Sequence, residues 1–230
     1  MSKLEILEKR WKELVGRPRS QEELEESDWL RKELELEYPK EYSSMTSELA
    51  DVGVMISSVY DLVNTAKSYP NAIPILLNHV NKDYHERNKE GIIRALAVKE
   101  ARGKASPILI AEYHRTPKDK MSLRWAIGNT IRMTITEDDV ESILPIVQDK
   151  TNGTSRQMFV VALGKVKSEK AENILINLLD DEEVILHALE ALGRMKSKKA
   201  KDKISMLTEH PKDLIKKEAK KALKKIGQLN

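Results

Sequence analysis

The side chains best suited to catalysis or metal binding are few and scattered in this sequence. Its five histidines lie far apart, and only at His85-Glu86 is a histidine directly followed by a glutamate. The chain has no Gly-rich phosphate loop, nucleophile elbow or zincin motif, and it has no cysteine to act as a nucleophile or thiolate ligand. The acidic runs at 137–139 and 180–183 fall where helices are expected to begin, and acids there complement the helix dipole. We therefore expect no enzyme activity, no catalytic residues, no metal and no cofactor.

A second group of polar residues suits recognition. Trp125 follows Arg124, and Asn129 and Arg132 lie on the next turns of the same predicted helix. A tryptophan among arginines has the composition of a binding hot spot. A tryptophan packed between helices would produce the same pattern, so both placements of Trp125 stay open. With basic residues at related positions of other repeats, the candidate partner-binding residues are Arg94, Arg124, Trp125, Asn129, Arg132, Arg156, Lys165 and Arg194.

The elements that must position these residues repeat along the chain. An alanine followed by Leu or Ile recurs at Ala95, Ala126, Ala162, Ala191 and Ala222, with spacings of 31, 36, 29 and 31 residues. Such a period is typical of stacked helical pairs that bury their apolar faces only against neighbouring pairs. The positions three before and one after each alanine are apolar in every repeat, so they should form the buried stripe.

This pattern predicts five pairs of helices. The first helices are expected at about 71–81, 104–115, 138–149, 170–180 and 199–209, and the second helices at about 86–101, 119–132, 155–167, 182–195 and 212–226. Positions one before and three after the alanine should line the concave surface. Glycines two residues after it (Gly128, Gly164, Gly193) should lie near helix ends.

Basic residues also recur six positions before the alanine, and their regularity favours a structural role. We expect them to pair between repeats with acids near the turns. The basic residues are Lys89, Lys120, Arg156 and Lys216, and the candidate acids are Asp119, Asp149, Asp180 and Asp213.

Residues 1–67 lack the repeat and are expected to form an N-terminal helical cap on a solenoid of residues 68–230. A helix over 3–15 should precede an acidic helix that starts at the capping box Ser20-Glu23 and stops at Tyr38-Pro39. A segment at 47–52 should follow, and then a short helix capped by Ser57. Whether this segment caps the stack or recognises the partner is open.

Composition indicates a folded, helix-rich protein. Apolar residues make up 40% and charged residues 33% of the chain, and aromatic residues only 4%. No apolar run approaches the roughly 20 residues that span a bilayer, so we expect a cytoplasmic protein without membrane contact. The net charge of +3 is uneven, because residues 1–50 carry 9 basic and 13 acidic side chains and residues 194–230 carry 13 basic and 4 acidic ones.

Two of these segments resemble HEAT repeats of the short bacterial type. Residues 155–164 (SRQMFVVALG) and 184–193 (VILHALEALG) follow the family's pattern of hydrophobic residues and alanines ending in Leu-Gly, and Pro74, Pro107 and Pro145 lie early in first helices. The resemblance covers about residues 70–227. It implies an all-α, right-handed α-solenoid with an N-terminal helical cap, and it implies an interaction module whose second helices line the concave face. Deoxyhypusine hydroxylase, a HEAT-like di-iron enzyme, needs several His-Glu pairs, and one pair does not match it.

The sequence thus favours a non-enzymatic protein-binding module with its partner on the concave face. The basic candidate residues favour an acidic protein partner. A toxin-neutralising bacterial immunity protein is one concrete form of this function. The alternative is a nucleic-acid-binding HEAT-like protein that uses the lysine-rich C-terminal half, although no aromatic residues are interleaved there for base stacking.

Overall fold

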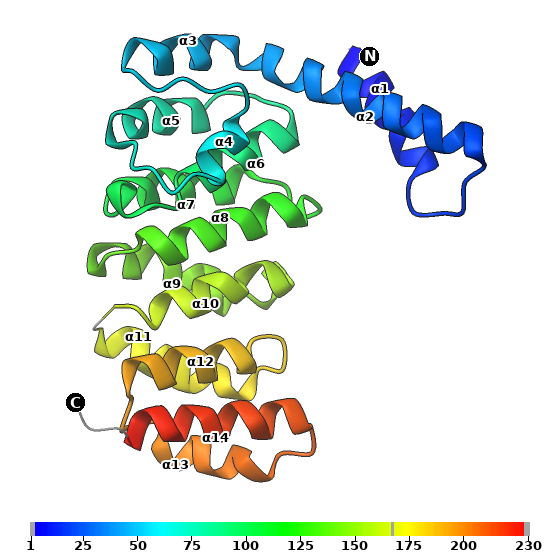
Figure 1. The fold of residues 1–230 in the computed structure, drawn as a ribbon. Coiled ribbons are helices and arrows are strands. Elements are labelled where there is room, and N and C mark those ends of the chain that lie inside the picture. The colour runs from blue at the N-terminus through cyan, green and yellow to red at the C-terminus, as the bar shows by residue number, and fades with distance from the viewer. Residues whose placement is uncertain (1–2, 167, 228–230) are drawn as a thin grey trace.

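The computed structural model describes residues 3–166 and 168–227, and the regular elements of this part are all helices. Ten of them form five pairs stacked along one axis (Figure 1). The pairs are α5 (Ile73–Val80) with α6 (Glu86–Ala95), α7 (Ala105–Arg115) with α8 (Met121–Thr134), α9 (Val140–Gln148) with α10 (Gln157–Leu163), α11 (Glu169–Asn177) with α12 (Ile185–Met195), and α13 (Lys201–Met206) with α14 (Asp213–Gly227). The five predicted helical pairs and the solenoid fold are confirmed.

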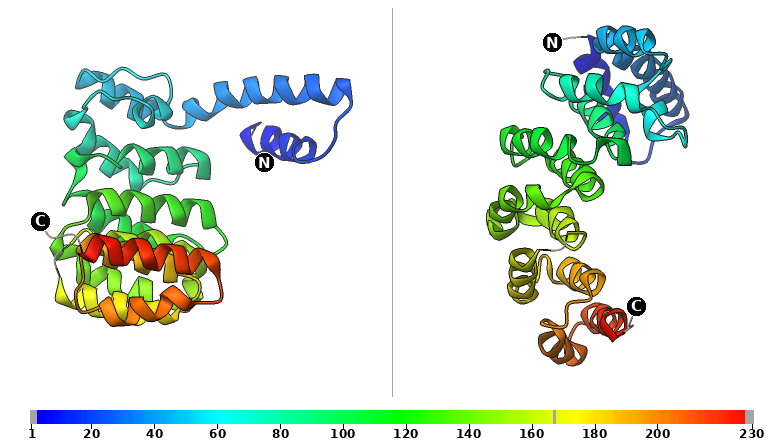
Figure 2. Two further views of the ribbon diagram at one scale, coloured as in Figure 1. Left: turned by 60° about the horizontal axis from the view of Figure 1, so that its bottom comes forward. Right: turned by 90° about the vertical axis from the view of Figure 1, so that its left-hand side faces the viewer.

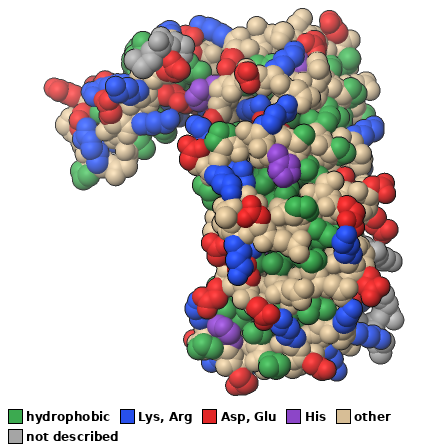
Figure 3. Space-filling model, turned by 180° about the vertical axis from the view of Figure 1, so that it is seen from behind, with side chains coloured by type: hydrophobic (Ala, Val, Ile, Leu, Met, Phe, Trp, Pro, Cys, Tyr) green, Lys and Arg blue, Asp and Glu red, His purple; other side chains and the backbone are tan. Residues whose placement is uncertain are grey.

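The stack is curved, and the second helix of each pair lies on the inner side of the curve (Figure 2, right). These helices form a continuous layer, in which α8 packs against α6 and α10, and α12 packs against α10 and α14. The concave surface is therefore made by the even-numbered helices α6 to α14. The opposite face, seen in Figure 3, carries acidic and basic side chains interspersed.

The apolar stripe predicted around the repeated alanine is the core of the solenoid. All five alanines are at most 1% exposed, and the residue three positions before each of them is buried as well. The residue after the alanine is buried in four repeats, while Leu223 in the last repeat is half-buried. One continuous hydrophobic cluster joins these positions from Tyr42 to Ile226.

The small residues let successive second helices approach closely. A Cβ atom added to Gly164 would lie 2.6 Å from Cα of Ala191 in the next repeat, and one added to Gly193 would lie 3.0 Å from Cα of Ala222. Gly164 is the C-cap of α10 and Gly193 lies in the last turn of α12, as predicted, whereas Gly128 lies in the middle of α8 and its predicted place near a helix end is wrong. Their role is to remove a side chain at the contact between helices.

Replacing Gly164 with alanine should therefore destabilise the protein. Alanine favours helix, but its methyl group would meet the backbone of Ala191, and overpacking of this kind costs about 1–3 kcal/mol. Gly227→Ala is the matched control, because nothing lies within 4 Å of a Cβ there. Urea unfolding followed by circular dichroism measures both, and a Gly164→Ala variant as stable as the wild type would contradict this packing.

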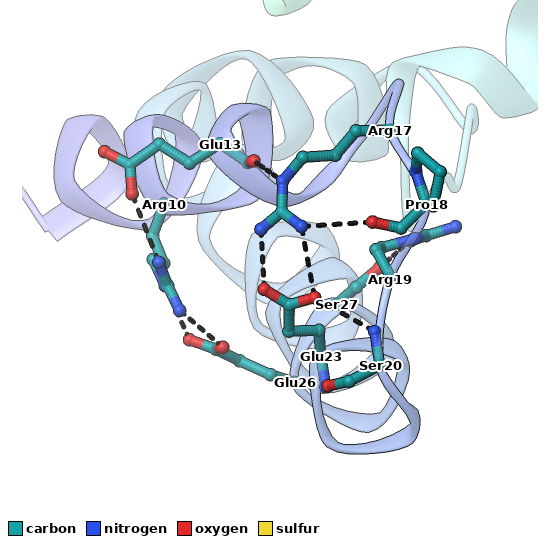
Figure 4. A network of polar contacts seen from close by, with 9 residues as sticks. All are labelled: Arg10, Glu13, Arg17, Pro18, Arg19, Ser20, Glu23, Glu26 and Ser27. Carbon is teal, nitrogen blue, oxygen red and sulfur yellow. Dashed lines mark hydrogen bonds and ion pairs between the residues drawn. The ribbon is translucent and has the colours of Figure 1, made fainter.

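The N-terminal segment begins with a helical hairpin, α1 (Lys3–Leu14) and α2 (Gln21–Glu41), that projects sideways from the stack (Figures 1 and 2). We call it the arm. It has its own small hydrophobic cluster, centred on four leucines of the two helices. A network of ion pairs closes its tip (Figure 4): Arg17 donates to Glu23 at 2.6 Å, and Arg10 makes two bonds of 2.7 Å to Glu26. The predicted Ser20-Glu23 capping box is present.

Three predicted boundaries of this segment are wrong, and the first is the start of the segment predicted at 47–52, which is a helix (Ser43–Asp51) that begins four residues earlier. The helix α2 continues through Pro39 to Glu41, because its last turn is held by the solenoid: the carbonyl of Tyr38 accepts from Asn88 at 2.9 Å, and the carboxylate of Glu41 accepts from the backbone N–H of His85 at 2.7 Å. Tertiary contacts thus outweigh the hydrogen bond lost at proline. The short helix α4 (Val59–Val63) is capped by Ser58 instead of Ser57, in a capping box with Asp61.

The rest of the N-terminal segment covers the end of the stack formed by the first helical pair, α5 and α6. The helix α3 (Ser43–Asp51) packs on α5, and α4 packs on α6, within the same hydrophobic cluster as the repeats. The arm docks beside them through Glu8, which lies 3.0 Å from Nε2 of His85, and through Tyr38, whose ring lies 4.8 Å from the guanidinium of Arg87. Among the described residues, no helix has the length and apolar character to cross a membrane.

Candidate partner-binding surface

Six of the eight predicted binding residues lie with exposed or half-buried side chains on the second helices or at their ends. Trp125 on α8 is 38% exposed, and the guanidinium of Arg94 on α6 lies 5.8 Å from its ring centroid. The guanidinium of Arg94 also pairs with the carboxylate of Glu90, one turn earlier on α6, at a distance of 2.7 Å. Asn129, Arg132 and Lys165 are half-buried, and Arg194 is exposed.

A shallow hollow surrounds the tryptophan. Its volume is about 280 Å³, and exposed Met121 extends its apolar wall. We call Trp125, Arg94 and Met121 the tryptophan patch. Trp125 therefore contacts the neighbouring repeat through Arg94 and still presents an indole surface to solvent, so it combines the two placements that the sequence left open. An aromatic ring of this size stacked with a cation is suited to anchoring an apolar or aromatic group of a partner.

Arg124 does not belong to this surface, and its prediction as a partner-binding residue is wrong. Its side chain is 4% exposed and points back under the α7–α8 turn. The guanidinium donates to the carbonyl of Thr116 at 2.8 Å and to the amide oxygen of Asn152 in the next repeat at 2.7 Å. It also lies 3.8 Å from the ring centroid of Tyr113. These bonds occupy the donors that a partner would need.

Arg156 is likewise internal, and its prediction as a partner-binding residue is corrected. It is 0% exposed and donates to Asp181 at 2.8 Å and to Glu183 at 2.7 Å, both in the turn of the next repeat. It also donates to the carbonyl of Val147 at 3.1 Å. Burial raises the pKa of Asp181, but the hydrogen bonds from Arg156 and from the backbone N–H of Glu183, together with the positive charge of Arg156, outweigh burial and hold this pKa below its ordinary value.

Two other members of the basic column that contains Arg156 also form ion pairs between repeats, with partners other than those expected. Lys89 is buried and lies 2.6 Å from Glu112 of the next repeat. Lys120 pairs at its exposed end with Glu86 of the preceding repeat. The turn acids predicted as partners mostly pair elsewhere, as Asp149 does with Lys118 and Asp180 with Lys203.

A second hollow lies where the C-terminal ends of α8, α10 and α12 meet the following turns. It has a volume of about 670 Å³, and we call it the cationic pocket. Its charged walls are Arg102, Lys165, Arg194, Lys196, Glu169 and Glu172. The remaining wall is largely apolar and includes Met133, Ile135, Val166 and Met195.

The electrostatics of this pocket centre on Lys165. Burial, and then the charges of Arg132, Arg194 and Arg102, lower the pKa of its ammonium group. Its hydrogen-bond acceptor is the sulfur of Met133 at 3.6 Å, which does not neutralise it. Cations of three other repeats thus act on the ammonium group of Lys165.

Arg102 and Lys196 are pocket residues that the sequence did not reveal. Both follow the end of a second helix, in turns outside the helical stripe that was searched for binding residues. Lys196 ends α12 in the left-handed conformation, with a φ of 56°. A comparison of basic residues six or seven positions after the repeated alanine would have grouped Arg102 with Arg132.

The C-terminal lysines are partly neutralised by neighbouring repeats. Lys199, Lys203 and Lys212 approach Glu169, Asp180 and Glu182 at 2.7–3.7 Å. The histidines do not gather either: His85 pairs with Glu8 of the arm, and within residues 3–166 and 168–227 no three His, Cys, Asp or Glu side chains are placed to hold a metal ion.

The match of a protein-family model supports the repeat assignment. A family model of HEAT repeats matches residues 140–224, which contain the second half of the solenoid. No curated protein matches the chain. Among solved structures, a designed armadillo repeat protein, YIII(Dq)4CqI, is 17% identical over 96% of this chain and 99% of its own, with a TM-score of 0.41.

Proposed function

We propose that this solenoid of HEAT-like repeats is a non-enzymatic module that binds another protein on its concave face. The observation that carries the proposal is the tryptophan patch. A large aromatic side chain, 38% exposed and overlaid by the arginine of the neighbouring repeat, lies on α8, one of the helices on the inner side of the curved stack. Anchors of this kind supply most of the binding free energy in protein interfaces.

The partner on this face is an acidic protein. Arg94, Arg132, Lys165 and Arg194 all lie on the inner helices or at their ends. A surface of one sign accelerates association with an oppositely charged partner and disfavours partners of like charge. Association should therefore slow as the ionic strength rises, since salt screens such charges beyond about 10 Å.

A specific form of this function is neutralisation of a toxin by a cytoplasmic bacterial immunity protein. A rigid concave surface with fixed charges is suited to covering the active surface of a small protein. A toxin gene next to the gene of this chain, and growth rescue on co-expression, would support this form. If co-expression does not rescue growth from the product of the neighbouring gene, the immunity role is rejected and the general protein-binding function is kept.

Affinity capture with paired variants tests the general proposal. The wild type should enrich one protein from its native lysate, and the concave variant Trp125→Ala/Lys165→Ser should lose it. The control variant Lys170→Ser alters an exposed lysine on the first helix α11 and should retain it. Nuclease treatment should not change the result. Loss of the captured material on nuclease treatment would instead indicate nucleic-acid binding through the C-terminal lysines.

A further inference from the structure

The cationic pocket carries an imbalance of charge that the fold itself does not require. Four cationic and two acidic side chains line it, and Arg132 adds a further positive charge that acts on Lys165. Within the described residues, Arg102, Arg132 and Lys165 form no ion pair with a carboxylate, whereas Arg194 pairs with Glu190. Like charges brought together in this way repel one another, and an anion in the pocket would relieve the repulsion.

Arg132, which lies outside the pocket lining but whose charge acts on Lys165, carries an unsatisfied polar atom. Its Nε atom is buried and has no hydrogen-bond acceptor in the structure. An unsatisfied buried donor is unfavourable, and guanidinium groups are suited to phosphoryl oxygens because they donate several bonds in a fixed plane. Part of the cost is offset by the carbonyl ends of α8 and α12, which favour nearby cations.

The shape and lining of the pocket select among anions. A volume of about 670 Å³ exceeds what a free phosphate ion needs, and Met133, Ile135 and Val166 provide apolar walls for a side-chain stem. The excess of cations over carboxylates in the walls favours an anion, and a phosphoryl group supplies close to two negative charges at neutral pH. A single carboxylate supplies only one negative charge, and Glu169 and Glu172 would repel a longer acidic run.

The pocket lies at a defined distance from the tryptophan patch along α8. Trp125 and Arg132 are separated by seven residues of helix, or about 10 Å at 1.5 Å per residue. An extended peptide covers this distance in about three residues at 3.3 Å each. One short segment can therefore reach both places.

We infer that the cationic pocket binds a phosphorylated side chain of the partner, about three residues from an apolar residue that covers the tryptophan patch. This inference rests on the proposed protein-binding function and names the chemistry of its ligand. The partner then binds in its phosphorylated form, and removal of the phosphate weakens the complex.

The test uses the full chain with two kinds of probe. Inorganic phosphate is titrated against protein with ¹⁵N-labelled lysine, and the side-chain signal of Lys165 is followed by NMR. Three amidated peptides are then compared, each with a leucine followed by two glycines. They differ only at the next position, which is phosphoserine, glutamate or serine. Their dissociation constants are measured by calorimetry.

We expect phosphate to shift the Lys165 signal and to raise the pKa of its ammonium group. The phosphoserine peptide should bind about 10-fold more tightly than the glutamate peptide, and Arg132→Gln or Lys165→Gln should remove at least about 10-fold of its affinity. Glu172→Gln should strengthen binding, because it removes a negative charge from the wall. Lys220→Gln, an exposed change on α14, is the control that should have no effect.

Two results would overturn the inference: an unchanged Lys165 signal at every phosphate concentration, or equal affinities of the three peptides. In both cases the captured protein partner can still depend on Trp125, which would preserve the proposed function and reject only the phosphorylated ligand. If the wild-type chain binds the phosphoserine peptide but captures no protein from the lysate, the protein-binding function is rejected separately.

Discussion

Replacing Arg156 with alanine should lower the free energy of unfolding by about 3–5 kcal/mol, the largest effect on stability that we expect from a single change. The side chain is 0% exposed and bonds to Asp181, Glu183 and the carbonyl of Val147. Its removal leaves the carboxylate of Asp181, which is 8% exposed, without its cation. The contact between the third and fourth repeats is then the weakest point of the stack.

The measurement is urea unfolding followed by circular dichroism, with two comparisons. The double variant Arg156→Met/Asp181→Leu should recover most of the loss, because a buried ion pair replaced by apolar groups is often neutral or stabilising. Lys170→Ala breaks the exposed pair with Glu141 and should cost less than about 1 kcal/mol. An Arg156→Ala variant no less stable than Lys170→Ala would show that Arg156 does not join the repeats.

The second large effect concerns binding. Trp125→Ala should weaken the complex with the protein partner by at least about 30-fold, as loss of a central aromatic anchor costs 2 kcal/mol or more. The double variant Trp125→Ala/Arg132→Ala should weaken it further, because it also removes a cation next to the cationic pocket. Helicity should be retained, since neither side chain is fully buried.

Trp29→Ala is the matched control for the tryptophan. Trp29 lies on the arm helix α2 and is 55% exposed, so its removal deletes the same side chain from a different surface. Affinity should be unchanged in this variant. If Trp29→Ala abolishes binding and Trp125→Ala does not, the arm is the recognition element. If Trp125→Ala unfolds the protein, its indole belongs to the core.

The repeat architecture could be predicted from the sequence because it depends on periodic apolar positions. The alanine columns identified every helical pair and the buried stripe. Helical periodicity also placed Trp125, Asn129 and Lys165 outside that stripe, where the structure has them.

The internal arginines could not be predicted in the same way. The charge of Arg124 and Arg156 favours an exposed position, but their long side chains turn toward neighbouring carbonyls and toward polar side chains of the next repeat. These partners lie 8 to 28 residues away, so periodicity within one helix does not reveal them. The continuation of α2 through Pro39 depends on Asn88 and His85 for the same reason.

The cationic pocket was missed because its walls come from several repeats. Lys165 and Arg194 were found as members of a helical column, whereas Arg102 and Lys196 lie in turns that join one repeat to the next. Only the stacking of the repeats brings these side chains to one place.

Site-specific photo-crosslinking in cells of the source organism tests the central claim most directly. A photoreactive residue is placed either at Asn129, between the tryptophan patch and the cationic pocket on α8, or at Ser142, an exposed position on α9 of the outer layer. Binding on the concave face predicts that one protein crosslinks from Asn129 and not from Ser142. Crosslinking of a partner from Ser142, with none from Asn129, would contradict it.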